Sequence, residues 1–274
     1  SKLTSGKIND VNNDGKVDTL DVEELKNQIL DRKQQKIKFI IDNSKKENTE
    51  FLSNVINSSD EKNTGEVLEK LIDTKNDLVE DVVEDLSDKN NQFLITSNSK
   101  GAGFIKERIF ENIVRNETDN SAAILSKVMN KSDQTTISSV INNITDKNEN
   151  KESKLSLKVG ADFAEKYSLK FENLTQNIPN QIEKLITSAV KVAESTIEDS
   201  NLIAKIILET EEEMNNFIVG EVIENSTDEK KTLSAKVLNL ITEINPKKIE
   251  TFSNENKTSI IDQVTQVAFD QDQG

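Results

Sequence analysis

The feature that most limits the fold of this chain is a helical spacing of apolar residues that recurs along most of its length. In the stretches "TGEVLEKLID" (64–73) and "NDLVEDVVEDL" (76–86), apolar residues fall on i, i+3, i+4 stripes. The breaks between such stretches are rich in Asn, Ser, Thr and Asp, which favour helix N-caps. No alternating run typical of a strand stands out. The sequence therefore predicts an all-α fold of short-helix hairpins, stacked as an α-solenoid or packed as an irregular bundle.

Three segments resemble one another, at residues 51–76, 124–148 and 217–245. Each contains an apolar helix end, a Ser/Thr-Asp junction and a second helix, which predicts a repeat unit of about 25 residues. Val55 and Val128 occupy matching places 73 residues apart, close to three such units. In a repeat array each hairpin buries its apolar stripe only against its neighbours. The alternative is that helices written from the same few residue types look alike through composition alone.

The charge and the aromatic content argue against two classes of partner. The formal net charge is −15, so phosphate backbones and anionic lipid surfaces would repel the chain. Aromatic residues make up 4% of the sequence and Trp is absent, which removes platforms for base stacking. No apolar run approaches the roughly 20 residues that span a bilayer. We therefore expect neither nucleic-acid binding nor membrane insertion.

Histidine and cysteine are both absent from the sequence. An enzyme built on this chain would lack the commonest general base, thiolate chemistry and the usual zinc ligands. Carboxylates are abundant, and one predicted helix carries Glu80, Asp81, Glu84 and Asp85. Paired carboxylates perform acid–base catalysis only where their surroundings separate their pKa values. We interpret this group as a solvated helix face and expect a non-enzymatic protein.

The densest chemical signal is the stretch "DVNNDGKVDTLD", from Asp10 to Asp21. Its pattern D-x-N-x-D-G-x5-D is that of an EF-hand loop, in which oxygen ligands surround Ca²⁺ and a glycine at the sixth position makes the sharp turn. Gly15 occupies that sixth position. The predicted ligands, in loop order, are Asp10, Asn12, Asp14, Lys16 through its backbone carbonyl, Asp18 and Asp21. Carboxylates packed this closely repel one another unless a divalent cation lies among them.

The stretch "NDVNNDGKVDTLDVEELKNQIL" (9–30) resembles one repeat of a dockerin, a calcium-dependent module that docks onto cohesin domains of bacterial surface assemblies. The resemblance rests on Asp rather than Glu at the last loop position, on the Gly-Lys-Val-Asp run, and on the helix that follows, with Leu25, Ile29 and Leu30. It covers residues 8–30, one repeat where dockerins carry two. It implies Ca²⁺ as the cofactor, a cohesin-like partner, partner contacts at Thr19 and Leu20, and an extracellular, cell-surface or periplasmic location.

These features divide the chain into three predicted regions. Residues 1–32 hold the dockerin-like loop and its helix, 33–148 a short-helix repeat region, and 149–274 a longer-helix region that resembles no family. The break at 145–153 contains no Ala, Val, Ile, Leu, Met or aromatic residue. Within the last region, 201–225 is predicted as one long helix interrupted near Gly220.

Two functions fit this sequence. In the first, the chain is a non-enzymatic structural or scaffold protein of a bacterial cell-surface or exported assembly. Bound calcium then holds the start of the chain against its first helix. With a Kd of ~10 μM and free Ca²⁺ at ~1 mM, the ion would add about 2.7 kcal/mol to the folded state. In the second, the loop belongs to a dockerin-like binding module that engages a cohesin-type partner through calcium-dependent pairing. The partner is expected to be another protein or further copies of the chain.

Overall fold

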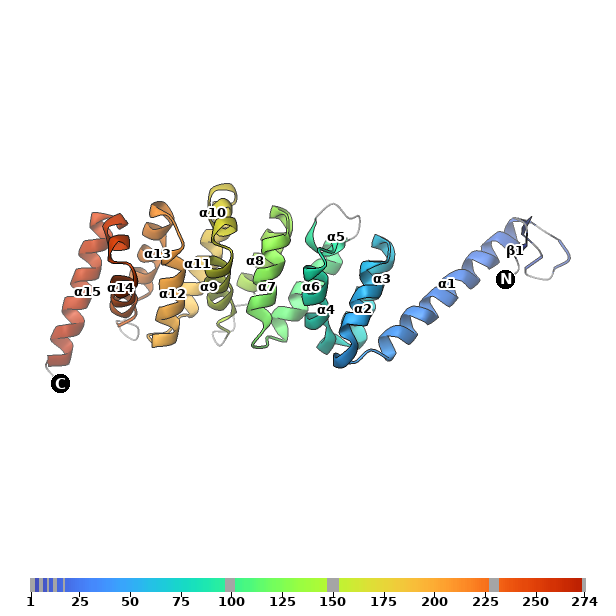
Figure 1. Cartoon of the computed structure of the whole chain (residues 1–274), viewed down its shortest axis with the longest axis horizontal. Coiled ribbons are helices and arrows are strands. Elements are labelled where there is room, and N and C mark those ends of the chain that lie inside the picture. Colours follow the sequence, from blue (N-terminus) through green and yellow to red (C-terminus); the bar gives the residue numbers. More distant parts are fainter. Residues whose placement is uncertain are drawn as a thin grey trace.

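The protein is an elongated array of short helices from which one long N-terminal helix projects (Figure 1). The computed structural model describes residues 3–4, 7–8, 10–11, 14–16, 18–96, 102–146, 153–226 and 232–272. The only strands in these ranges are β1 (Leu3–Thr4) and β2 (Lys7–Ile8), which pair antiparallel. The all-α prediction is confirmed, and of its two architectures the structure has the stacked solenoid.

Helices follow one another with short polar breaks, as the apolar stripes predict. In chain order they are α1 (Thr19–Asp42), η1 (Lys46–Asn48), α2 (Thr49–Asn57), α3 (Glu61–Thr74), η2 (Asn76–Leu78), α4 (Val79–Asp88), α5 (Gln92–Ile95), α6 (Ala102–Arg115), α7 (Ser121–Lys131), α8 (Gln134–Asp146), α9 (Leu155–Lys166), α10 (Ser168–Asn177), α11 (Pro179–Val192), α12 (Ile197–Leu208), α13 (Glu212–Asn225), α14 (Thr232–Ile244), η3 (Pro246–Thr251) and α15 (Asn254–Asp272). The breaks supply N-caps, because Asp60, Asn91 and Thr196 each accept a backbone N–H of the helix that follows.

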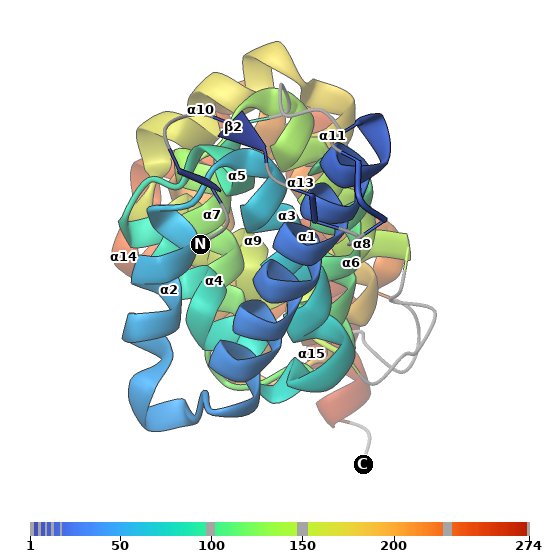
Figure 2. The same cartoon turned by 90° about the vertical axis from the view of Figure 1, so that its right-hand side faces the viewer.

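The helices form two layers that run side by side along the array (Figures 1 and 2). The first layer contains, in order, α2, α4, α7, α9, α12 and α14. The second layer contains, in order, α1, α3, α6, α8, α11, α13 and α15. Side-chain hydrogen bonds between hairpins join residues from 32 positions apart (Ser53 to Asp85) to 45 positions apart (Lys154 to Asp199). Each hairpin is thus fastened to its neighbours in sequence, as in other quasi-one-dimensional repeat proteins.

The repeat is longer than the sequence indicates. Helices α2, α7 and α12 begin at Thr49, Ser121 and Ile197, so two successive hairpins occupy 72 and then 76 residues. Val55 and Val128 therefore lie two hairpins apart, and the prediction of three units of about 25 residues is wrong. Segments 51–76 and 124–148 correspond to hairpins α2–α3 and α7–α8, whereas 217–245 spans α13 and α14, which belong to successive hairpins.

Alternate hairpins are longer because each contains an extra short helix: α5, α10 or η3. Each insert is attached to the C-terminal end of the first-layer helix of the preceding hairpin. The contacts are Asn91 Nδ2 to Asn57 Oδ1 (3.0 Å) for α5, Lys170 Nζ to the Ser132 carbonyl (3.2 Å) for α10, and Lys248 Nζ to the Leu208 and Thr210 carbonyls for η3. Lysines suit these sites because the last carbonyls of a helix lack partners within it. Burial lowers the pKa of Lys248, although the nearby carboxylates of Glu209 and Glu211 oppose that shift.

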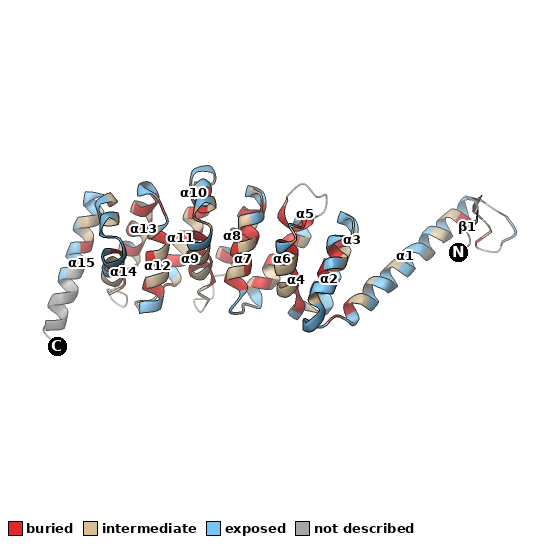
Figure 3. Ribbon diagram, in the orientation of Figure 1, coloured by how far each residue is buried: buried red, intermediate tan, exposed pale blue. Residues whose placement is uncertain are grey.

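The core is one continuous cluster of buried apolar residues. Figure 3 marks the buried residues in red along the length of the array. At its middle, the fully buried ring of Phe163 lies 5.8 Å from the ring centroids of both Tyr167 and Phe171. The pair of Phe163 and Phe171 is edge-to-face, an arrangement that adds to the free energy gained from burial alone. Phe163 belongs to α9 and Phe171 to α10, and Tyr167 is the single residue between these helices, where a first-layer helix meets its insert.

The prediction of one long helix over 201–225 is wrong. Helix α12 ends at Leu208 and α13 begins at Glu212, while Gly220 lies inside α13. At the break, the Thr210 hydroxyl donates to the carbonyls of Ile206 and Ile207 near the end of α12, 3.1 Å away in each case. The acidic residues at the start of α13 then favour a helix N-terminus, where the helix dipole stabilises negative charge.

The acidic group on α4 is not a solvated face, so that prediction is also wrong. Glu80 accepts hydrogen bonds from the Thr118 and Ser121 hydroxyls at 2.7 and 2.5 Å. Glu84 pairs with Lys127 of α7 at 3.0 Å. The remaining contacts are Asp85 with the Ser53 hydroxyl (3.1 Å) and Asp81 with Lys46 (3.9 Å). The carboxylates thus bind the neighbouring hairpins on both sides of α4.

The three-region division stays a prediction. Helix α1 continues without a break across residues 32 and 33, and the buried core continues from α8 to α9 on either side of residue 148. After residue 153 the α-helices have 10 to 19 residues, and between residues 49 and 146 they have 4 to 14.

Candidate functional site

The predicted calcium loop forms a closed turn around two carboxylates. Asp10 begins it, and its two carboxylate oxygens accept the backbone N–H groups of Asp14 (3.2 Å) and Gly15 (2.9 Å). Gly15 has φ +86°, a conformation that side chains with a Cβ rarely adopt. No atom lies within 4 Å of a Cβ built there, so this backbone angle, rather than a lack of space, requires the glycine.

Asp21 closes the loop from the first turn of α1 and is fully buried. Its Oδ1 accepts the N–H of Val11 at 2.5 Å, and its Oδ2 accepts the N–H of Asp18 at 2.9 Å. Asp18 in turn caps α1 by accepting the N–H of Leu20 at 2.8 Å. One buried carboxylate thus joins the start of the loop, its end and the helix that follows.

The other predicted ligands differ in their surroundings. Asp14 is exposed and accepts the N–H of Lys16 at 2.9 Å, and Lys16 itself is exposed. Asn12 lies outside the described residues. Among the described residues, no group of three or more acidic side chains converges closely enough to hold a metal ion. The turn at Gly15 and the closure at Asp21 nevertheless fit a loop wrapped around a hard cation, because every predicted ligand atom is an oxygen.

The chain after α1 has no second loop of this kind in its described residues. The turn at 43–48 is closed by side-chain amides: Asn43 donates to the Phe39 carbonyl (2.7 Å), and Asn48 accepts the N–H of Lys45 (2.5 Å). Two lysines, Lys45 and Lys46, occupy its centre, where a calcium loop would need acidic ligands. The single loop found in the sequence therefore agrees with the described structure.

The loop and the first turn of α1 lie far from the helical array (Figure 1). Helix α1 has 24 residues, a length of about 36 Å, and only Asp21 and Ile41 in it are buried. Thr19 and Leu20, the residues implied as partner contacts, are exposed, and Leu20 retains 54% of its accessible surface. A partner can therefore reach this end of α1 without touching the array.

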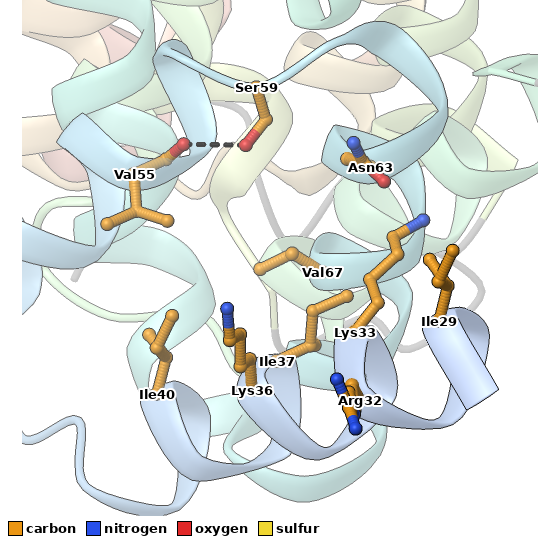
Figure 4. A pocket seen from close by; sticks show the side chains of 10 residues that line it. All are labelled: Ile29, Arg32, Lys33, Lys36, Ile37, Ile40, Val55, Ser59, Asn63 and Val67. Atoms are coloured by element: carbon orange, nitrogen blue, oxygen red, sulfur yellow. Dashed lines mark hydrogen bonds between the residues drawn. The ribbon is translucent and has the colours of Figure 1, made fainter. Parts of the chain in front are cut away.

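Sequence reasoning missed a groove at the junction of α1 with the array. It lies between α1, α2 and α3 and has a volume of about 420 Å³. Figure 4 shows its lining of apolar and basic side chains, among them Ile37, Ile40, Val55 and Val67, with Arg32, Lys33 and Lys36. Lys33 is paired with Glu66 at 2.7 Å. The basic run "RKQQKIK" (32–38) was the available signal, in a chain that is otherwise strongly acidic.

A comparison with known protein families found a match for the N-terminal part of the chain. Residues 8–60 match the family model of the Dockerin type I domain. The match confirms the resemblance drawn from residues 8–30 and extends it through α1 to the end of α2. Neither a curated protein nor a solved structure matches the chain.

Dockerin type I domains are non-catalytic modules that bind calcium, pair with cohesin partners and occur in secreted or cell-surface proteins. Beyond residue 60 the described residues are almost all helical. No described helix is both long and apolar enough to cross a membrane.

Proposed function

We propose that the N-terminal arm, residues 10–42, is a calcium-dependent attachment module that binds a cohesin-type domain and carries the helical array as its cargo. The observation that supports this most is the position of the loop, at the far end of a long and largely unburied helix. The first turn of α1 presents Leu20 and Thr19 to solvent there. The similarity of residues 8–60 to type I dockerins points to the same function.

Calcium would be held by Asp10, Asn12, Asp14, the Lys16 carbonyl, Asp18 and Asp21. The carboxylates of Asp10, Asp14, Asp18 and Asp21 accept backbone N–H groups, and the ion would screen the repulsion among these four groups. Since Asp21 also caps α1, an ordered loop fixes the direction in which Leu20 projects. We therefore expect partner binding to require calcium even though the ion lies beside the contact surface.

The array itself is proposed as a non-enzymatic scaffold of an extracellular, cell-surface or periplasmic assembly. The chain has no His or Cys, and the acidic side chains of α4 are engaged in contacts between hairpins. A second candidate, in which the ion only staples the loop to α1, is favoured by one observation. The fully buried Asp21 carboxylate already joins the loop to the helix.

Binding of the full chain to a panel of type I cohesin domains separates these candidates. In calcium we expect one cohesin to bind, and we expect chelator to abolish the complex. Leu20→Asp should remove cohesin binding and leave calcium binding intact, because its side chain points to solvent. Leu169→Asp is the matched control, since Leu169 lies in the array and retains 82% of its surface. Equal cohesin binding by both variants, or no cohesin binding by the wild type, would favour the second candidate, in which calcium only joins the loop to α1.

A further inference from the structure

The first layer of the array repeats its contacts in a fixed register. Lys127 of α7 reaches back to Asp88 of α4 at 3.1 Å, and Lys205 of α12 reaches back to Glu165 of α9 at 2.8 Å. The two lysines are 78 residues apart and their acidic partners 77, so the same contact occurs at the same place in successive repeats. Helices α7 and α12 thus each contact the preceding first-layer helix through a lysine in their C-terminal half and an acidic residue near the C-terminal end of that neighbour.

Helix α2 has a face that corresponds to the one through which α7 and α12 contact the preceding first-layer helix. No first-layer helix precedes α2 among the described residues. By the same register its residues Phe51, Asn54 and Val55 correspond to Ile124, Lys127 and Val128 of α7. Phe51 retains 59% of its surface and Val55 is half-buried, whereas Ile124 retains 2% and Val128 none. The N-terminal end of the array therefore exposes an apolar face that the inner repeats bury.

Helix α14 has the matching face at the other end. Glu243 lies 78 residues after Glu165, at the end of α14 as Glu165 is at the end of α9. It is exposed and pairs with no cation among the described residues. Asn239, one turn earlier, is exposed at the place where Ala161 of α9 retains 1% of its surface. Among the described residues, α14 thus has no neighbour corresponding to the one that α12 provides to α9.

The charges of the two ends are complementary as well. The groove beside α2 carries Arg32 and Lys36 together with the paired Lys33. On α15, which follows α14, the exposed Ile261 lies beside Asp262, and Glu255 is exposed on the same helix. An apolar and acidic helix from the C-terminal end thus matches an apolar and basic groove at the N-terminal end.

We propose that the chain associates with further copies of itself end to end, the α14–α15 hairpin of one copy packing on α2 and the adjoining groove of the next. Glu243 then faces Asn54, where the inner repeats place a lysine. Because the two contacting surfaces differ, the contact is head to tail. Stacking along the axis of the array then extends it into linear oligomers. This inference is independent of the attachment function proposed for the loop.

A gain-of-association variant tests the register directly. Asn54→Lys would recreate the ion pair of the inner repeats across the interface, and we expect it to lower the dissociation constant about two- to fivefold. Gln176→Lys makes the same change of charge on the exposed surface of α10 and should leave association unchanged. Sedimentation velocity over a range of concentrations, with calcium and with chelator, measures both. End-to-end association should persist in chelator, whereas pairing through the calcium loop should not.

A mixing experiment then tests whether the contact is head to tail. In the Asn54→Lys background, Phe51→Glu blocks the receiving end and Glu243→Lys blocks the donating end. Each double variant alone should sediment as a monomer, and an equimolar mixture should form a dimer and nothing larger. Far-UV circular dichroism checks that both stay folded, as their exposed positions lead us to expect.

Four results would overturn the proposal. The first is a wild-type chain that sediments as a single monomeric species at every concentration, whatever Asn54→Lys does. The second is equal association of Asn54→Lys and Gln176→Lys. The third is self-association of either blocked variant alone, which would show a two-fold contact elsewhere on the surface. Association that disappears in chelator would likewise assign the contact to the calcium loop and not to the ends of the array.

Discussion

Phe163→Ala is expected to lower the free energy of unfolding by about 3–5 kcal/mol, the range for removing a buried aromatic ring. Phe163 is fully buried in α9 at the centre of the array, and it packs against Phe171 and Tyr167. Because each hairpin contacts only its neighbours, a cavity in α9 weakens the coupling between the hairpins that precede α9 and those that follow it. We therefore expect the denaturation curve to broaden or to split into two steps, as well as to shift.

Chemical denaturation followed by far-UV circular dichroism measures this effect. Phe39→Ala is the control, because Phe39 lies on α1 and retains 69% of its surface; its change should stay within about 0.5 kcal/mol. A Phe163→Ala protein that unfolds in one step at the wild-type midpoint would contradict the packing described for α9.

Lys154→Met is expected to cost about 3 kcal/mol, because it leaves the Asp199 carboxylate buried without its cation. Asp199 lies in the first turn of α12 with its side chain 2% exposed, and Lys154 Nζ lies 2.8 Å from it. The N–H of Glu194 also reaches this carboxylate, at 2.7 Å, which places the cost at the lower end for a broken buried pair. The contact joins α9 to α12 across 45 residues, so its loss should also weaken coupling between hairpins.

Lys205→Met is the matched control, since Lys205 and Glu165 retain 42% and 50% of their side-chain surfaces. That variant should lose about 0.5 kcal/mol, as exposed ion pairs do. Burial alone would lower the pKa of Lys154, but its hydrogen bonds to Asp199 and Glu194 raise it above the ordinary value for lysine. The stabilisation is therefore fully present below that ordinary value and is lost as the pH rises through the raised one. A Lys154→Met protein with the pH dependence of the wild type in this alkaline range would contradict the role of the pair.

Helix type could be predicted from the sequence because an amphipathic stripe is a local property. The length of the repeat could not, because it depends on the inserts α5, α10 and η3. Their attachment involves residues such as Lys170 and Lys248, which reach carbonyls 38 or more positions earlier in the chain. A lysine followed by apolar residues carries no local sign of such a contact.

The acidic face of α4 shows the same limit for side chains. By its spacing alone, Glu80 belongs to a charged stripe that water would solvate. Its two hydroxyl donors, Thr118 and Ser121, come from the next hairpin, about 40 positions away, and nothing in the α4 sequence marks them. Polar contacts between repeats have to be seen in the structure before they can be assigned.

The candidate site was more accessible to sequence reasoning than the array. The spacing of Asp10, Gly15 and Asp21 specifies a loop because each position has its own backbone requirement, and the structure places Gly15 at φ +86° as that spacing demands. The burial of Asp21 beneath Val11 could not be foreseen, since it depends on the loop closing against α1. The groove at Arg32 and Lys36 was missed because it forms between three helices.

Calorimetric titration of the full chain with calcium tests the central claim most directly. We predict saturable binding of one ion per chain. Asp14→Ala should abolish it, because the change removes one of the predicted carboxylate ligands. The loop should keep its closure on α1, since Asp14 is exposed and the Asp21 cap of α1 stays in place. Asp31→Ala removes an exposed aspartate of α1 outside the loop and should bind as the wild type does. An absence of binding in the wild type, or equal binding by Asp14→Ala, would contradict the assignment of residues 10–21 as a calcium loop.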